Sequence, residues 1–368
     1  MHTKIEKRYQ RAKELFEAGK VEQAISILQD IIAQDPGYLP AYYSLGYAYM
    51  ERGENNRAEP VLLKLAEMRP DWDIVHLQLG KVYENLQQWE KALAYYQTGT
   101  RLKPDNPYAR MHLGIMYQIL NKIAESVYEL QQAYQLGLGE FSVVYNLANG
   151  WYKLDNITAA LNLLDKEIEG AKIEGRDLAK LHNLRGGIYS SQDRPKDAYL
   201  DFQKAVEISP DEAEFFIDLG DFYFEQGELE RAINSYQQAL NTDDPPGRIY
   251  KRIGLAQLGL GNWNAAITAL EKAKTVGEAS FYELGLAYYE LYDNEKAIEN
   301  FALELVQDGP AKAEANYYLG FIYDEIGKHD LSERVFKQFL ELAASRSHEA
   351  EWRSWIAQVE EKLKDRQS

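Results

Sequence analysis

Apolar and polar residues follow one another along this chain with the spacing of amphipathic helices. The stretch from Tyr42 to Gly53 reads YYSLGYAYMERG, and its apolar side chains return every three or four residues. Near the C-terminal end, the stretch from Glu349 to Gln367 has charged residues on one helical face and a set of large apolar residues on the other: Trp352, Trp355, Ile356, Val359 and Leu363. Both patterns predict α-helices.

Glycine recurs inside these predicted helices, although an interior helical glycine costs about 1 kcal/mol relative to alanine. The step from one to the next is constant along most of the chain, as from Gly46 to Gly80, and alanine takes the place of glycine twice. The recurring small residues are Ala12, Gly46, Gly80, Gly114, Ala148, Gly186, Gly220, Gly254, Gly285 and Gly320. Since two helices approach closely only where the facing residues are small, we expect a helix crossing at each position. We expect the facing residue to be the alanine that follows twelve places later.

Other positions repeat in step with the small residue. Most units have an aromatic residue three places after it, as in Tyr49, and a large apolar residue sixteen places after it, as in Leu62. This pattern resembles the tetratricopeptide repeat (TPR) family, whose unit is a helix–turn–helix of about 34 residues. The resemblance implies an all-α, right-handed superhelical solenoid of antiparallel helix pairs. It covers ten units over residues 5–346, starting near residues 5, 39, 73, 107, 141, 179, 213, 247, 278 and 313, followed by a capping helix at 347–366.

Two intervals depart from this constant step. The interval from Ala148 to Gly186 is longer and includes the segment IEGAKIEGR, for which we predict one extra turn on the second helix of the fifth unit. The interval from Gly254 to Gly285 is shorter, and Gln257 stands where the aromatic residue belongs. We therefore predict a looser joint around residues 257–285, with faster hydrogen exchange than in neighbouring units.

Composition narrows the range of functions. The chain has 58 acidic and 41 basic residues among 368, for a formal net charge of −17, which does not suit a general nucleic-acid binder. It has no cysteine, no apolar run long enough to span a bilayer, and no apolar secretory segment near its N-terminus. We expect a cytoplasmic protein that does not insert into membranes.

No constellation of catalytic residues emerges from the sequence. The six histidines show no metal-ligand spacing, and the absence of cysteine excludes thiolate chemistry. The recurring glycines are explained by helix packing rather than by phosphate binding. We expect a protein without enzymatic activity, cofactor or metal.

The family resemblance implies that the first helix of each unit lines a concave groove. The lining positions are three before, one after and four after the small residue, and they form two apolar, aromatic stretches separated by a polar unit. The groove residues predicted to bind a partner are Tyr43, Tyr47, Met50, Met111, Ile115, Tyr145, Asn149, Tyr152, Phe224, Leu255, Leu258, Tyr282, Leu286, Tyr289, Tyr317 and Phe321. Exposed apolar patches mark interaction sites, so we expect an adaptor or assembly scaffold that binds a protein or peptide partner. Acidic residues near the second stretch favour a partner with apolar anchors and basic residues.

Three alternatives stay open. The groove side chains can pack on one another instead of on a partner. Arg248, Lys251 and Arg252 form a basic cluster, and Arg248 and Arg252 match part of the clamp with which some TPR co-chaperones bind an acidic C-terminal tail. Asp218 and Leu184 stand where that clamp requires asparagine. The third alternative is a self-associating structural scaffold, which makes a homo-oligomer the relevant state.

Overall fold

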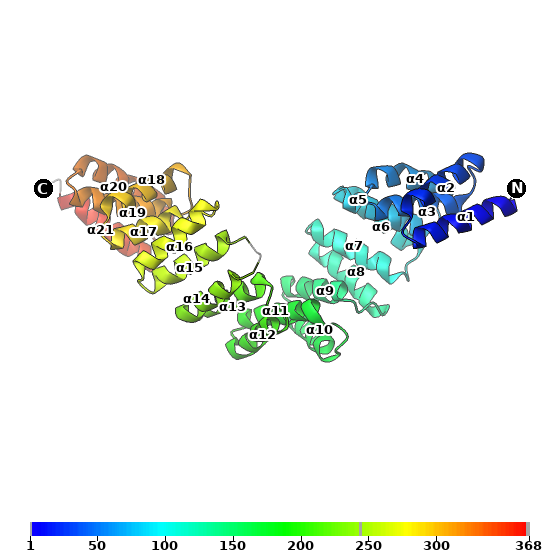
Figure 1. Cartoon of the computed structure of the whole chain (residues 1–368). Coiled ribbons are helices and arrows are strands. Elements are labelled where there is room, and N and C mark those ends of the chain that lie inside the picture. Colours follow the sequence, from blue (N-terminus) through cyan, green and yellow to red (C-terminus); the bar gives the residue numbers. More distant parts are fainter. Residues whose placement is uncertain (1, 243–244, 366–368) are drawn as a thin grey trace. The chain divides into compact units, whose positions relative to one another are not determined.

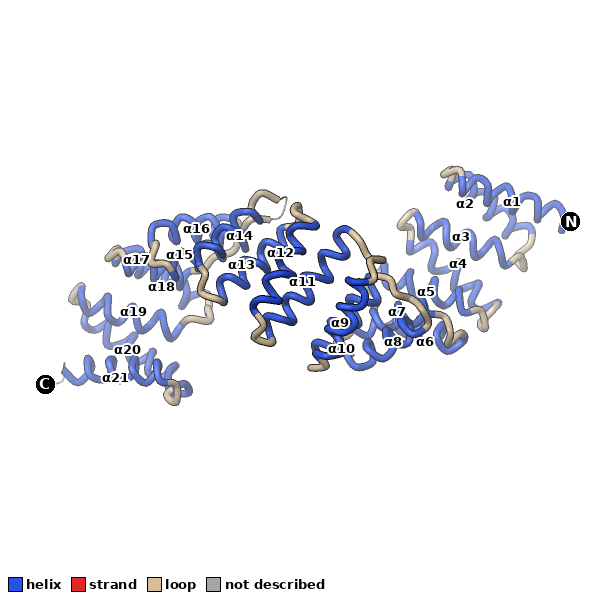
Figure 2. The backbone as a smooth tube through the Cα atoms, turned by 90° about the horizontal axis from the view of Figure 1, so that it is seen from below, coloured by secondary structure: helices blue, strands red, loops and turns tan. Residues whose placement is uncertain are grey.

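The structure is a computed structural model that describes residues 2–242 and 245–365. Within these ranges it contains twenty-one α-helices, one short 3₁₀-helix and no strand, so the predicted all-α class is confirmed (Figure 2). None of the helices in the described ranges is both long and apolar enough to cross a membrane.

The chain divides into two compact bodies, and Figure 1 labels the helices of each. The N-terminal body, Met1–Gln192, contains α1 (His2–Glu17), α2 (Val21–Gln34), α3 (Leu39–Glu51), α4 (Asn55–Met68), α5 (Asp73–Asn85), α6 (Trp89–Leu102), α7 (Pro107–Ile119), α8 (Ile123–Gln135), α9 (Phe141–Lys153), α10 (Ile157–Glu169) and α11 (Gly175–Ser191). The C-terminal body, Asp193–Ser368, contains α12 (Pro195–Ile208), α13 (Ala213–Glu225), α14 (Leu229–Ala239), α15 (Gly247–Gly259), α16 (Trp263–Thr275), α17 (Phe281–Glu290), α18 (Asn294–Val306), α19 (Lys312–Glu325), α20 (His329–Ala343), the 3₁₀-helix (Ala344–Arg346) and α21 (Ala350–Asp365). Within each body, consecutive helices pack as pairs, and each pair packs on the next.

The recurring glycines lie at the crossings of these pairs. A Cβ atom on Gly46 would lie 2.5 Å from Leu62, and one on Gly220 would lie 2.4 Å from Tyr236. The nearest atoms thus belong to the large residue sixteen places later rather than to the alanine that we expected to face the glycine. The residue twelve places later is also close at Gly114, where an added Cβ atom would lie 3.2 Å from the backbone oxygen of Ser126. Alanine ends at Cβ, whereas the longer side chain on the second helix extends across the glycine. The glycines therefore make room for a large apolar or aromatic side chain.

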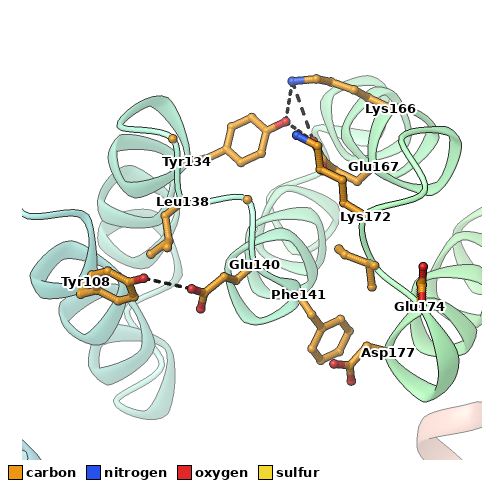
Figure 3. A pocket seen from close by; sticks show the side chains of 13 residues that line it. Tyr108, Tyr134, Leu138, Glu140, Phe141, Lys166, Glu167, Lys172, Glu174 and Asp177 are labelled. Atoms are coloured by element: carbon orange, nitrogen blue, oxygen red, sulfur yellow. Dashed lines mark hydrogen bonds and ion pairs between the residues drawn. The ribbon is translucent and has the colours of Figure 1, made fainter.

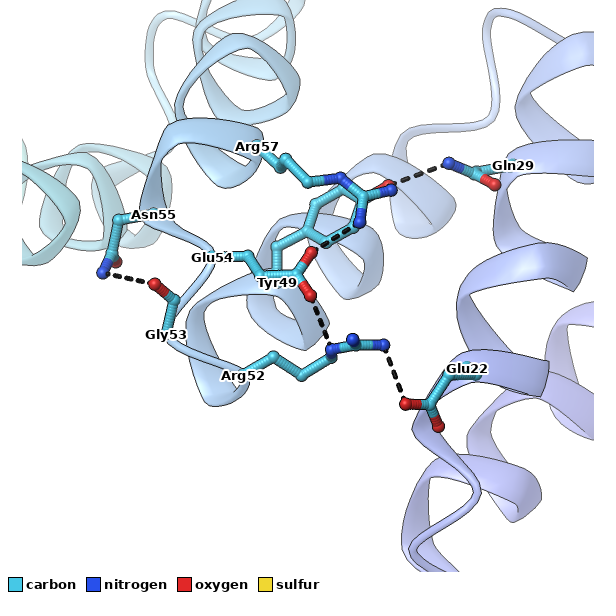
Figure 4. A network of polar contacts seen from close by, with 8 residues as sticks. All are labelled: Glu22, Gln29, Tyr49, Arg52, Gly53, Glu54, Asn55 and Arg57. Carbon is cyan, nitrogen blue, oxygen red and sulfur yellow. Dashed lines mark hydrogen bonds and ion pairs between the residues drawn. The ribbon is translucent and has the colours of Figure 1, made fainter.

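The tyrosine three places after the glycine fixes the turn between paired helices (Figure 4). Arg57 donates a hydrogen bond of 2.9 Å to the Tyr49 hydroxyl, lies over its ring at 4.3 Å, and pairs with Glu54 at 2.6 Å. Gln29, in the preceding helix pair, donates to the same hydroxyl at 2.8 Å. Arg231, Glu228 and Tyr223 repeat this arrangement in the C-terminal body, where Arg231 donates to Tyr223 at 2.7 Å and lies 4.1 Å over its ring.

The turn itself requires a left-handed backbone at the seventh position after the small residue. Glycine meets this requirement in five units, for example Gly53 with φ of 72°. Five other units hold the same conformation without glycine, at Gln87, Asn121, Asp155, Asp193 and Tyr292, with φ from 53° to 59°. Asparagine and aspartate tolerate this conformation, whereas at Gln87 and Tyr292 the packing of the two helices imposes it.

The extra residues of the longest interval extend a different helix from the one we predicted. α10 has 13 residues, like most of its neighbours, whereas α11 has 17. Ala171, just after α10, has φ of 50°, which ends a right-handed helix. The insertion therefore forms a loop and the lengthened start of α11.

Helix α21 packs its apolar face on the last helix pair. Trp352 is 3% exposed, and Trp355 stacks on Tyr317 of α19 with ring centroids 4.8 Å apart. Lys362 pairs with Asp324 at 3.2 Å. This helix therefore covers apolar surface that the last pair would otherwise expose.

Candidate functional site

The predicted groove residues all lie on the first helix of a pair, but few of them are open to solvent. Tyr47 and Phe224 are each 38% exposed, Met111 and Tyr317 are buried, and the others are half-buried. Many pack on one another or on neighbouring aromatic residues. We call this set of predicted groove residues the stripe. Mutual packing therefore accounts for part of the stripe, and Tyr317, which α21 covers, is one clear case.

A cavity of about 170 Å³ opens beside Tyr47 in the N-terminal body. We call it the N-terminal groove pocket; it lies between α1, α2 and α3 and is lined by Ala12, Lys13, Phe16, Glu17, Leu28, Tyr43, Ser44 and Tyr47. The rings of Phe16 and Tyr47 lie 5.7 Å apart, and Tyr43 stacks on Trp72 at 5.5 Å. A hydrogen bond to Glu51 is the largest cause of the raised pKa of Tyr47, so its hydroxyl stays protonated. The pocket is mostly apolar, with one lysine and one glutamate at its edge.

A second cavity, of about 230 Å³, opens beside Phe224 in the C-terminal body. This C-terminal groove pocket lies between α13, α14 and α15 and is lined by Asp221, Phe224, Tyr236, Lys251, Arg252 and Leu255. The Tyr236 hydroxyl donates to Asp221 at 2.7 Å, and Arg252 Nε donates to both carboxylate oxygens of Asp221 at 2.7 and 3.0 Å. Burial, followed by the bond to Asp221, raises the pKa of Tyr236. The pocket therefore combines an apolar wall with a fixed ion pair.

The predicted basic cluster is mostly neutralised within the chain. Arg248 pairs with Glu214 at 2.7 Å, and Arg252 is held by Asp221. Lys251 has no ion-pair partner among the described residues and lines the C-terminal groove pocket. An acidic tail would have to compete with two intrachain carboxylates, so the geometry does not favour such a ligand.

A related network lies in the N-terminal body, where Tyr96 occupies the same place in its unit as Tyr236 and the carboxylate comes from a different place on the first helix. Tyr96 donates to Glu84 at 2.6 Å, and Lys81 pairs with Glu84 at 2.7 Å. His112 stacks on the Tyr96 ring with centroids 5.1 Å apart, and burial lowers the pKa of this imidazole. At neutral pH the histidine is therefore uncharged.

Sequence reasoning treated Tyr96 and Tyr236 as packing residues and missed their hydroxyls. The sequence did contain a signal for these hydroxyls. At the position sixteen places after the small residue, eight units have leucine or phenylalanine and only these two have tyrosine. A buried tyrosine hydroxyl usually has a hydrogen-bond partner. Among the described residues, no three or more His, Cys, Asp or Glu side chains are arranged to hold a metal ion.

Comparison with known sequences identifies the family. Three models described as tetratricopeptide repeat match residues 15–76 and 190–253, residues 74–106, and residues 282–348, which together span more than half of the chain. The chain belongs to the tetratricopeptide repeat family. A role in protein interaction is typical of TPR proteins.

Several known proteins resemble this TPR chain at low identity. It is 22% identical over 246 residues to DnaJ homolog subfamily C member 3 of Bos taurus, a match that covers 67% of this chain but 44% of the relative. A tetratricopeptide repeat protein from Parabacteroides merdae superposes with a TM-score of 0.52 and 16% identity, covering 69% of this chain and 98% of that one. The APC/C hetero-tetramer Cut9–Hcn1 superposes with a TM-score of 0.50 and 19% identity, covering 76% and 55%. At these identities the solved structures support the fold alone.

Proposed function

We propose that this TPR protein is a non-catalytic adaptor or assembly scaffold, and that a partner peptide or helix binds along the first helices of its units. The observation that carries this proposal is the pair of groove pockets. Each lies beside one of the two exposed residues of the stripe, Tyr47 or Phe224, and each is lined in part by other residues of the stripe. We also propose the division into ten units over 5–346 with a cap at 347–366.

The chemistry of the pockets supports a partner with apolar anchors and basic residues. The N-terminal groove pocket offers aromatic walls to an apolar side chain. In the C-terminal body, Glu225, Glu290 and Glu325 are exposed at the ends of α13, α17 and α19, and no described basic residue pairs with them. Lysine or arginine residues in the partner would complement these carboxylates.

The test is to select peptides from a random phage-displayed library on the immobilised protein and to measure their affinities by fluorescence anisotropy. Tyr47→Ala and Phe224→Ala remove the exposed aromatic side chain of each pocket. If that side chain is a binding hot spot, the affinity of peptides that use the pocket falls about tenfold or more. The matched controls are Tyr128→Ala on α8 and Leu200→Ala on α12, since these side chains are 59% and 63% exposed and lie outside both pockets.

Selected peptides that bind both pocket variants and both controls with unchanged affinity would remove the proposal. A preference for acidic peptides, weakened by Arg252→Ala, would instead favour the acidic-tail alternative. Light scattering over a concentration series tests self-association, which would appear as a rising molar mass. The cytoplasmic location stays a prediction.

A further inference from the structure

A larger cavity lies in the N-terminal body, outside both groove pockets (Figure 3). We call it the loop pocket; its volume is about 760 Å³. It is built from the start of α7 and from the connections that follow α8 and α10. The residues that line it are Tyr108, Tyr134, Gly137, Leu138, Gly139, Glu140, Phe141, Lys166, Glu167, Lys172, Ile173, Glu174 and Asp177.

The hollow lies between two connections. Residues 136–140 join α8 to α9, and Gly137 there has φ of 94°, in the left-handed region that glycine tolerates best. Residues 170–174 join α10 to α11 and carry part of the insertion that lengthens the interval from Ala148 to Gly186. The apolar side chains of these connections that line the pocket, Leu138 and Ile173, are buried against the core. They therefore leave the space between the connections open.

A mostly buried carboxylate lies at one wall of the loop pocket. Glu167 is 8% exposed, and its Oε1 accepts a short hydrogen bond from the Tyr134 hydroxyl. Lys166 donates to the same hydroxyl at 2.6 Å and lies 3.8 Å from Oε1 of Glu167. No donor among the described residues reaches Oε2 of Glu167. This oxygen is not among the fully buried atoms that lack a hydrogen-bond partner, so it keeps some contact with solvent and a ligand that brings N–H groups can reach it from the pocket.

The rim adds further negative charge and aromatic surface. Tyr108 is 50% exposed and donates to Glu140 at 3.2 Å, while Glu174 and Asp177 have no ion-pair partner among the described residues. The lining holds four carboxylates and two lysines. Lys180 already lies 5.4 Å over the Phe141 ring, so the exposed ring of Tyr108 is the aromatic surface that stays available to a ligand cation.

We propose that the loop pocket binds an arginine-containing segment of a protein partner, with the guanidinium group directed toward Oε2 of Glu167. Arginine fits better than lysine, because its planar group donates several hydrogen bonds to a carboxylate and stacks on aromatic rings. The cavity is large enough for neighbouring residues of the segment, whose charges would meet Glu174 and Asp177. This site is separate from the groove and does not depend on partner binding there.

The experiment uses blocked peptides in which glycine alternates with arginine, lysine or glutamate, titrated into the full chain by calorimetry. We expect the arginine peptide to bind more tightly than the lysine peptide, and the glutamate peptide not to bind. Glu167→Gln should weaken the arginine peptide about tenfold, as expected for loss of a charge-assisted hydrogen bond. The double variant Glu174→Gln with Asp177→Asn should weaken it to a similar degree.

Three further variants distinguish binding at this site from general attraction to an acidic protein and from binding in the groove. Glu90→Gln removes one exposed carboxylate on α6, outside the pocket, and should change the affinity less than twofold. Lys172→Ala should tighten binding severalfold, because it removes a competing cation from the lining. Tyr47→Ala, in the N-terminal groove pocket, should have no effect, so the two proposals fail or succeed separately.

Equal weakening by Glu167→Gln and Glu90→Gln would overturn the proposal, as would equal binding of the arginine and glutamate peptides. If Glu167→Gln unfolds, which thermal melting would show, the double variant Glu174→Gln with Asp177→Asn and the variant Lys172→Ala decide the outcome. Unchanged affinity for the arginine peptide in both of those variants would also overturn the proposal.

Discussion

Two equivalent places in the molecule use a buried tyrosine differently. In the α5 network, formed by Lys81, Glu84, Tyr96 and His112, the carboxylate and its lysine lie on one helix, three residues apart. In the α13 network, formed by Asp221, Tyr236 and Arg252, the arginine comes from α15, in the next helix pair. His112 and Arg252 occupy the same position, two residues before the recurring glycine.

The comparison shows that the same buried hydroxyl supports two kinds of joint between neighbouring pairs. Where the next pair contributes histidine, the two pairs are in contact through the stacked rings of Tyr96 and His112, and the Glu84 carboxylate pairs with Lys81 of its own helix. Where it offers arginine, the carboxylate links two pairs through contacts of Arg252 Nε with both of its oxygens. Of the two networks, the second ties one unit to the next by charge.

The largest effect should come from filling the space under the tyrosine ring. A Cβ atom at Gly80 would lie 2.6 Å from Tyr96, and one at Gly220 would lie 2.4 Å from Tyr236. Gly80→Ala and Gly220→Ala should each lower the free energy of unfolding by about 2–3 kcal/mol through overpacking. Urea denaturation measures this change.

Gly187→Ala is the matched control for both substitutions. Gly187 is also helical, and a Cβ atom added there would have no neighbouring atom within 4 Å, so alanine should stabilise the protein by up to about 1 kcal/mol. If all three substitutions shift stability in the same direction, the crossing does not require glycine.

The next effect concerns the hydroxyl alone. Tyr96→Phe should destabilise by about 2 kcal/mol, since it removes a hydrogen bond to a carboxylate that is 20% exposed. Tyr236→Phe should have a smaller effect, about 1 kcal/mol, because Asp221 is 36% exposed and keeps both bonds to Arg252. Urea denaturation again gives both values.

Tyr250→Phe is the control for this pair. Tyr250 is half-buried, and no hydrogen bond to its hydroxyl is present among the described residues, so phenylalanine should change the stability by less than about 0.5 kcal/mol. Equal losses at Tyr96, Tyr236 and Tyr250 would show that the carboxylates contribute nothing.

Much of this fold follows from the sequence, because the recurring small residue marks each crossing and its spacing sets the helix pairs. Other features do not follow. No property of Gln87 or Tyr292 favours a left-handed backbone, which the packed helices impose. The pairing of Arg252 with Asp221 spans 31 residues and requires the geometry of neighbouring pairs.

The candidate sites were predictable to different degrees. Helical spacing placed Tyr47 and Phe224 on one stripe, and both lie beside a pocket. The same spacing could not show that α21 covers Tyr317, since that contact depends on how the last helix folds back. The loop pocket could not be predicted either. The sequence does not show whether the inserted residues lengthen α10 or form a loop before α11, and this loop forms part of the pocket.

A smaller effect on stability distinguishes the two basic residues of these networks, Arg252 and Lys81. Arg252→Ala should destabilise by about 1 kcal/mol and should speed hydrogen exchange in both α13 and α15, since it removes a link between two helix pairs. Lys81→Ala should cost about 0.3–0.5 kcal/mol, the usual contribution of an exposed pair within one helix, and should affect α5 alone. Hydrogen exchange with mass spectrometry resolves the helices, and equal protection of α15 in both variants would contradict the difference.

The smallest effect, and one confined to the α5 network, is a response to pH. Burial lowers the pKa of His112 below its ordinary value of about 6.5, so as pH falls the unfolded chain takes up the proton first. Stability from this group is therefore complete above about pH 6.5 and decreases below it. His112→Phe keeps a ring on Tyr96 but cannot titrate. We expect its melting temperature to fall less than that of the unmodified protein between about pH 7 and about pH 5.5. Parallel curves for the two proteins would mean that His112 binds its proton equally well folded and unfolded, and that the stack on Tyr96 does not depend on a neutral imidazole.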